Sequence, residues 1–163
     1  MLWKIRGGNI MSDKQWITVE CPECHHSQEV ELWSSLNVQI SPEAKTDFLE
    51  EKINLFNCDN CGEVASLAAS FAYHDMELKM YVQLHPPQNI DEQILRMYKA
   101  DGSSSIDGLG PLKSNRDILA STEYMRHPHI VFSMQEAILY VQFRENLARF
   151  HHNQNSNDAD DVQ

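Results

Sequence analysis

The sequence predicts an α+β fold: a β-rich ribbon with two C-x₂-C knuckles and an inserted helix, joined to a C-terminal helical part. Two cysteine pairs, Cys21/Cys24 and Cys58/Cys61, are the first observation behind this prediction. The second is that polar and apolar residues alternate beside both pairs, which is typical of strands. The third is that apolar residues recur at helical spacing between the pairs and again near the C-terminus.

Composition indicates a single domain with a hydrophobic core. The 163 residues are 42% hydrophobic, and 24 Asp and Glu against 13 Lys and Arg give a formal net charge of −11. Such a charge disfavours polyanionic partners such as nucleic acid or an anionic membrane. No segment approaches the ~18 apolar residues of a membrane span, and the N-terminus lacks the apolar region of a secretory signal. We therefore expect a cytoplasmic protein whose thiols stay reduced.

Three regions are expected along the chain. Residues 1–14 form an N-terminal extension, and its first ten residues are interpreted as an upstream start or an expression scar because Met11 resembles a natural start. Residues 15–150 form the cysteine-containing domain, divided into the ribbon, 15–86, and the helical part, 87–150. The polar tail, 151–163, is expected to be disordered.

The ribbon begins with three predicted strands, 15–20, 29–32 and 36–40, with a turn at Ser34-Ser35. A helix over 41–53 follows. Ser41 is its predicted N-cap, and Pro42 suits the first helical position because its missing N–H has no partner there.

A second β region covers residues 55–85. An apolar stretch at 64–73 and strict alternation at 78–85 predict two strands joined by a turn at 74–77. Pro86 and Pro87 end the second strand, since proline cannot donate to a ladder.

The helical part starts with a short helix predicted at 91–100 and a Gly- and Ser-rich linker at 102–115. Ser133 and Glu136 have the spacing of a capping box, which predicts a helix running to about Phe150. Its apolar residues cover more than half of the circumference. Either one face packs on the domain while another meets a partner or a second copy, or the helix is central in its own domain.

The cysteine spacing carries the chemistry. A C-x₂-C turn presents two sulfurs on one side, and two such turns complete the tetrahedral S₄ set that suits Zn²⁺. We therefore expect one structural Zn(II) per chain, held by Cys21, Cys24, Cys58 and Cys61. The 33 residues between Cys24 and Cys58 exceed the usual spacing. A folded insertion between the knuckles explains the difference.

Other chemistries for these cysteines stay open at this stage. They are two disulfides, a redox-active pair, an iron or iron–sulfur site, and replacement of one sulfur by His25 or His26. A catalytic zinc is disfavoured because four thiolates leave no open position. The sequence shows no phosphate-binding loop, nucleophile elbow or carboxylate pair, so no catalytic residue is predicted and we expect a protein that is not an enzyme.

The chain resembles the CpXC domain family, small prokaryotic proteins with paired CPxC-like motifs. The resemblance rests on Cys21-Pro22-Glu23-Cys24, the strand region from Gln28 to Val38, Cys58-Asp59-Asn60-Cys61-Gly62, and Tyr73-His74-Asp75-Met76. It covers roughly residues 16–150 and implies zinc ligation by the four cysteines, but it brings no activity. Two positions depart from the pattern. His25 stands where glycine often follows the first pair, and Asp59 stands where proline is common.

Local charge separates the two leading functions. From Gln15 to Ala44 the chain has five Glu and no Lys or Arg, and Ile53 to Leu78 again has no Lys or Arg. A zinc ribbon that binds nucleic acid needs Lys and Arg to neutralise phosphates. Because both segments lack them, nucleic-acid binding is the alternative function rather than the leading one. We expect a protein-interaction or regulatory module whose partner is another protein, or a second copy of the chain in a homo-oligomer. A redox or zinc-dependent enzyme is the least favoured function.

Overall fold

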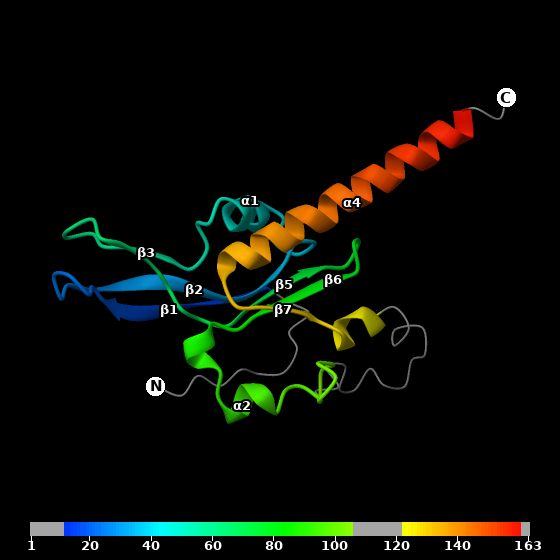
Figure 1. The fold of residues 1–163 in the computed structure, drawn as a ribbon. Coiled ribbons are helices and arrows are strands. Elements are labelled where there is room, and N and C mark those ends of the chain that lie inside the picture. Colours follow the sequence, from blue (N-terminus) through cyan, green and yellow to red (C-terminus); the bar gives the residue numbers. More distant parts are fainter. Residues whose placement is uncertain (1–11, 106–121, 161–163) are drawn as a thin grey trace.

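The computed structural model describes residues 12–105 and 122–160, and the side chains of residues 155–160 lie outside that description. These residues form a five-stranded mixed sheet in the order β1-β2-β5-β6-β7, with a two-stranded sheet, β3-β4, beside it (Figure 1). Helices pack on the larger sheet. The predicted α+β class is therefore confirmed, with the four cysteines gathered on two knuckles.

The larger sheet combines antiparallel and parallel pairs. β1 is antiparallel to β2, β2 is parallel to β5, β5 is antiparallel to β6, and β6 is parallel to β7. The strands are β1 (Asp13–Glu20), β2 (Ser27–Asn37), β5 (Phe71–Asp75), β6 (Met80–Leu84) and β7 (His129–Val131); the small sheet pairs β3 (Leu55–Asn57) with β4 (Val64–Ser66). The helices are α1 (Glu43–Leu49), α2 (Glu92–Leu95) and α4 (Met134–Asp160), with 3₁₀ turns η1 (Pro87–Asn89) and η3 (Glu123–Arg126).

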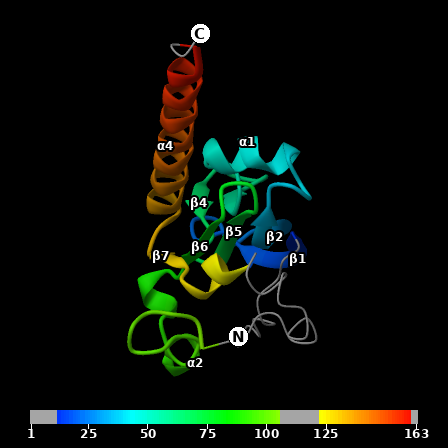
Figure 2. The same ribbon diagram turned by 90° about the vertical axis from the view of Figure 1, so that its right-hand side faces the viewer.

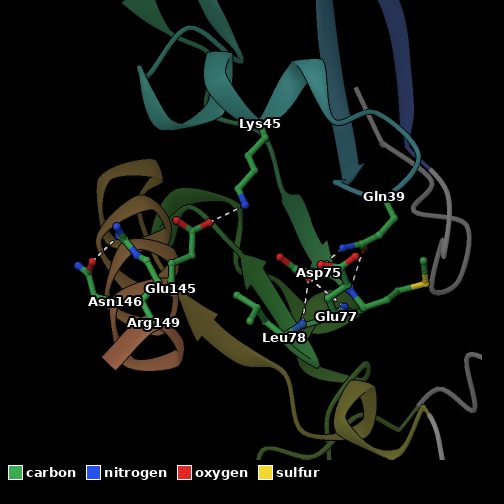
Figure 3. A network of polar contacts seen from close by, with 9 residues as sticks. Gln39, Lys45, Asp75, Glu77, Leu78, Glu145, Asn146 and Arg149 are labelled. Atoms are coloured by element: carbon green, nitrogen blue, oxygen red, sulfur yellow. Dashed lines mark hydrogen bonds and ion pairs between the residues drawn. The ribbon is translucent and has the colours of Figure 1, made fainter. Parts of the chain in front are cut away.

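Helices α1 and α4 cover one face of the larger sheet (Figure 2). Phe48 of α1 is fully buried and stacks against Phe71 of β5, with ring centroids 5.8 Å apart. Ala137, Ile138 and Val141 bring α4 into the same core. An ion pair between Lys45 Nζ of α1 and Glu145 Oε1 of α4, 2.6 Å apart, joins the two helices (Figure 3).

The other face of the larger sheet carries buried histidine–tyrosine pairs. His74 Nε2 lies 2.6 Å from the Tyr124 hydroxyl, and His85 Nε2 lies 2.5 Å from the Tyr98 hydroxyl. These bonds attach η3 and the segment after α2 to the sheet. Burial lowers the pKa of both histidines, because the charged imidazolium loses its hydration there.

The predicted turn at Ser34-Ser35 is wrong. β2 runs unbroken from Ser27 to Asn37, and Ser35 pairs with Asp13 of β1 and with Ala72 of β5. Two neighbouring strands give this stretch ladder partners on both sides, which outweighs the preference of serine for turns. The chain then turns at 38–40, where the Asn37 side chain accepts a hydrogen bond from Gln39 N.

Helix α1 is shorter than predicted and lacks the predicted cap. Its N-cap is Pro42 rather than Ser41, and no side chain caps it. The helix ends at Leu49 rather than near residue 53, and Glu51, directly after the C-cap Glu50, takes a positive φ of 59°. Left-handed backbone at this position ends the α-helical hydrogen-bond ladder.

The apolar stretch 64–73 divides between the two sheets. β4 ends at Ser66 and β5 starts at Phe71, while the hairpin predicted between the next two strands is present as β5-β6. Its turn lies two residues later than predicted, after Asp75. Asp75 Oδ1 fixes that turn by accepting hydrogen bonds from Gln39 Nε2, Glu77 N and Leu78 N (Figure 3).

The helical part follows the prediction in type and differs in length. α2 spans only Glu92–Leu95 of the predicted 91–100, and the Asp91 side chain caps it. Most of the predicted linker, residues 106–115, lies outside the described residues. Ser133 Oγ accepts from Glu136 N as the capping box requires, whereas the Glu136 carboxylate accepts from Phe132 N rather than from Ser133 N.

Two elements of the structure cross expected boundaries. β1 begins at Asp13, so the last residues of the predicted extension, 1–14, belong to the sheet, and residues 1–11 lie outside the described part. At the other end, α4 continues to Asp160 and so extends into the tail for which disorder was expected. No Gly or Pro follows Phe150 to stop the helix. Residues 161–163 lie outside the description.

Candidate metal centre

Both cysteine pairs lie in the turns of antiparallel hairpins. The first knuckle joins β1 to β2, and the second joins β3 to β4. The two turns share one backbone pattern. Cys21 N donates to His26 O and His25 N donates to Cys21 O, while Cys58 N donates to Glu63 O and Gly62 N donates to Cys58 O. In each turn the first cysteine is thereby fixed at the base.

The two hairpins meet at their tips and bring the four sulfurs together. All four Sγ atoms lie within 4.8 Å of one another. Cys21 Sγ is 3.6 Å from Cys61 Sγ, and Cys24 Sγ is 3.6 Å from Cys58 Sγ. Zn–S bonds of about 2.3 Å in a tetrahedron place sulfurs about 3.8 Å apart. The donor set therefore fits a single metal ion.

The electrostatics of the cluster favour a bound cation. A hydrogen bond with the Asn60 side chain, then one with the His26 backbone, lowers the pKa of Cys24 to about 6. The Glu63 backbone lowers the pKa of Cys61, but desolvation and three neighbouring sulfurs outweigh that bond and raise it to about 12. Four sulfurs this close cannot all ionise by themselves, because thiolates repel one another. A divalent cation removes that repulsion.

The structure accounts for His25 after the first knuckle. His25 has a φ of 57°, and Gly62 holds the equivalent place in the second knuckle with a φ of 76°. A residue with a Cβ carries a cost of roughly 1–2 kcal/mol in this left-handed conformation. The His25 ring lies 2.8 Å from Glu20 Oε1. His25 thus adopts the conformation that glycine provides in the second turn.

Gln28 connects the two knuckles and explains the second departure. Its side-chain nitrogen donates to Asn57 O at 2.9 Å, and its side-chain oxygen accepts from Asp59 N at 2.9 Å. Proline at position 59 has no N–H to donate. Asp59 therefore supplies a bond between the hairpins that the more common residue cannot make.

A small hydrophobic core packs around two of the four cysteines. Cys21 and Cys58 are buried in it with Val30 and Phe56. Asn54 joins β2 to the second hairpin: its side chain accepts from Trp33 N at 2.7 Å and donates to Trp33 O at 2.9 Å. Sequence reasoning missed Gln28 and Asn54, because single amides in loops and strands follow no recognisable spacing.

The sulfur cluster contains cysteines alone among the described residues. His25 and His26 were considered above as replacements for a sulfur ligand. Both are exposed, and neither belongs to the sulfur cluster. The cysteines lie in β-hairpin turns, so neither pair has the helix N-terminus that activates a redox thiol. Cys61 is exposed, which places one side of the cluster at the surface.

A surface cavity of about 430 Å³ lies next to the ribbon, between β2, α1 and β3. Its walls mix Lys14, Lys52, Glu31 and Asp47 with Trp33, and Lys14 forms an ion pair with Glu31 at 2.8 Å. The residues that line it include no cysteine, histidine or serine. This cavity therefore provides none of the side chains of a cysteine or serine nucleophile with a histidine base.

Fold and site together define an α+β protein with a four-cysteine site built on two hairpin turns. The chain matches the model of the CpXC protein family over residues 19–157, and it belongs to that family. No curated protein matches the chain, and no solved structure does. Within the described residues, every helix is too short or too polar to cross a bilayer.

Proposed function

We propose that the four cysteines bind one Zn(II) that holds the two hairpins together. The observation that carries this proposal is the approach of all four sulfurs to within 4.8 Å of one another. Zn(II) supplies charge compensation and tetrahedral geometry without redox chemistry. With four thiolates in place the ion has no open position, so its role is structural.

Iron is the closest competitor for the same sulfurs. Sulfurs that all surround one point suit a mononuclear ion better than a cluster, whose irons take separate ligands. A mononuclear iron site fits the geometry equally, so metal content decides between them. The proposal also implies a reducing compartment, which we take to be the cytoplasm.

Protein interaction is the cellular role that we propose for the stabilised domain. The exposed residues of the knuckles include Glu20, Glu23 and Asp59, while Lys and Arg are missing from both surrounding segments. Such a surface repels phosphates, which disfavours nucleic acid, and it suits a neutral or basic protein surface.

Elemental analysis of protein purified without added metal tests the metal proposal. One zinc per chain is expected in the wild type, with loss of zinc in Cys58→Ser and full zinc content in His26→Ala. The second variant is the control, because it removes the neighbouring side chain that is able to replace a sulfur. Iron as the main metal, or zinc retained by Cys58→Ser and lost from His26→Ala, would contradict the assignment.

A further inference from the structure

Helix α4 has a second apolar face that the domain does not use. Leu139, Phe143, Leu147 and Phe150 are 58%, 59%, 40% and 56% exposed. At about 100° per residue, their mean direction is roughly opposite to that of Ala137, Ile138 and Val141, which face the core. We call these four residues the outer stripe. An exposed large apolar patch of this kind marks an interaction surface.

The outer stripe is free of charge although the protein is strongly acidic. Between residues 135 and 154, the charged residues of α4 are Glu136, Arg144, Glu145 and Arg149. Glu136 lies at the N-terminal end of the stripe, where its carboxylate accepts from Phe132 N. Arg144 donates to Leu78 O of the body. Glu145 pairs with Lys45 of α1 (Figure 3). Arg149 donates to Asn146 Oδ1 at the edge of the stripe. A surface without charge lets two copies meet without burying like charges.

The spacing of the outer stripe is complementary to itself. When a second α4 runs antiparallel, Leu139 faces Phe150 and Phe143 faces Leu147. Each leucine then meets a phenylalanine, and the two-fold axis lies between residues 144 and 145. The domain lies on the opposite side of α4, so the two bodies lie outside the helix pair and do not obstruct it (Figure 2).

The exposed area is sufficient for a dimer. The four side chains offer on the order of 400 Å² of apolar surface in each copy. The polar residues beside them, Gln135, Gln142, Asn146 and Asn153, are exposed and extend the contact. Both copies together bury about 1,200 Å², which is the lower end of the range for specific interfaces.

The helix itself also needs a partner. Among the side chains that are described, Val141 is the last buried residue of α4, yet the helix continues to Asp160 and projects from the body (Figure 1). Helices owe most of their stability to packing of an apolar face, and an isolated helix of 12–15 residues is marginal in water. A partner along the outer stripe supplies that packing for residues 142–150.

We propose that the outer stripe packs antiparallel against the same stripe of a second copy of this chain, forming a two-fold dimer. The proposal adds an interaction surface on α4 to the acidic knuckle surface described above. It does not depend on which metal the cysteines hold. Metal content reports on the site, whereas mass in solution reports on the dimer, so either proposal can fail alone.

Light scattering and sedimentation of the metal-loaded protein, from about 1 µM to 300 µM, test the dimer. The wild type is expected to change from monomer to dimer in this range. Phe143→Glu should raise the dissociation constant at least about 100-fold, because the symmetric interface buries the new charge twice. Glutamate is a good helix former, so the thermal melt should keep its midpoint at low concentration. Leu95→Glu, a change at an exposed leucine of α2, is the matched control and should leave the dimer intact.

A charge exchange tests the antiparallel arrangement. Leu139→Glu alone should be monomeric, whereas Leu139→Glu combined with Phe150→Lys should dimerise again, because residue 139 faces residue 150 of the other copy. A wild type that stays monomeric throughout the range would overturn the proposal. The same holds for a dimer that Phe143→Glu leaves unchanged or that the double variant fails to restore. If the protein stays monomeric and instead binds a different protein through Phe143, the dimer proposal is overturned in favour of a heterologous partner.

Discussion

The two hydrophobic cores of this protein differ in what they need in order to form. The main core joins strands of the larger sheet to α1 and α4, with Phe48, Tyr73 and Val141 fully buried. In the cysteine core, the buried residues described are only Cys21, Val30, Phe56 and Cys58. Four buried side chains, of which only Phe56 is large, cannot balance the entropy of ordering two hairpins. The first core is therefore self-sufficient, whereas the second should depend on the metal ion that we propose for the four cysteines.

This difference predicts that metal loss does not unfold residues 15–85 as a whole. Strand β2 contributes to both cores, with Val30 in the cysteine core and Leu36 in the main core, but the buried side chains of the two cores form separate clusters. β3 and β4 have three residues each and pair only with each other among the described strands. Damage from metal removal should thus be confined largely to the knuckles and the small sheet.

Metal removal should have the largest effect. Structural zinc contributes on the order of 10–16 kcal/mol in finger peptides, which is comparable with the total stability of about 5–15 kcal/mol of a whole domain. After chelation, amides of residues 54–67 should lose protection from hydrogen exchange, while those of β5 and β6 keep it. Adding zinc back should restore protection. Equal loss of protection in both regions would show that the two cores are one cooperative unit.

Truncation of a side chain inside the main core should have the second-largest effect. Phe48→Ala removes a ring that is fully buried between α1 and β5, and should lower the free energy of unfolding by about 3–5 kcal/mol. Zinc content should stay at the wild-type value because the cysteines belong to the other core. Phe132→Ala, at a residue that is 48% exposed, is the control and should cost less than about 1 kcal/mol. Urea unfolding measures both; similar losses would contradict the assignment of the core.

Acid should destabilise the sheet by a smaller amount. Burial lowers the pKa of His74 and His85 below the ordinary histidine value of 6.5, so the unfolded chain binds more protons than the folded chain just below that pH. Stability is complete above pH 6.5 and falls as pH decreases toward the lowered pKa. The slope is at most about 1.4 kcal/mol per pH unit for each histidine.

Urea unfolding of His74→Gln/His85→Gln beside the wild type isolates this effect. Both proteins keep the four cysteines, so any acid release of metal appears equally in each. The double variant should show a weaker decline in stability between pH 7.5 and 5.5. An identical decline in the two proteins would show that these histidines do not cause it.

The smallest effects should distinguish the two knuckles. Gly62→Ala should cost about 1–2 kcal/mol, entirely from its φ of 76°, because no atom lies within 4 Å of the added Cβ. His25→Gly should be neutral or stabilising by less than about 1 kcal/mol. Glycine adopts the positive φ of this position without strain, and the greater entropy of glycine in the unfolded chain offsets most of that gain. Thermal melts of the zinc-bound proteins measure both. Destabilisation by His25→Gly larger than by Gly62→Ala would mean that the His25 ring matters more than its backbone.

Periodic and spaced features of the sequence predicted the fold class, the two knuckles and the capping box of α4. C-x₂-C turns and the Ser133–Glu136 pair are local, so short-range chemistry determines them. The errors occur where strands that are distant in the sequence determine the local structure. Ser34 and Ser35 lie in a strand because β1 and β5 pair with it, and the stretch 64–73 divides between two sheets. The bridge from Gln28 to the second knuckle is also long-range, and no local pattern predicts it.

The central claim is that two hairpins are joined by one tetrahedral Zn(II) with four sulfur ligands. X-ray absorption at the zinc edge, on protein purified without added metal, tests it most directly. The account predicts four sulfurs at about 2.3 Å and no nitrogen or oxygen neighbour at bonding distance. A shell with nitrogen or oxygen at about 2.0 Å, or protein that contains no zinc, would contradict it.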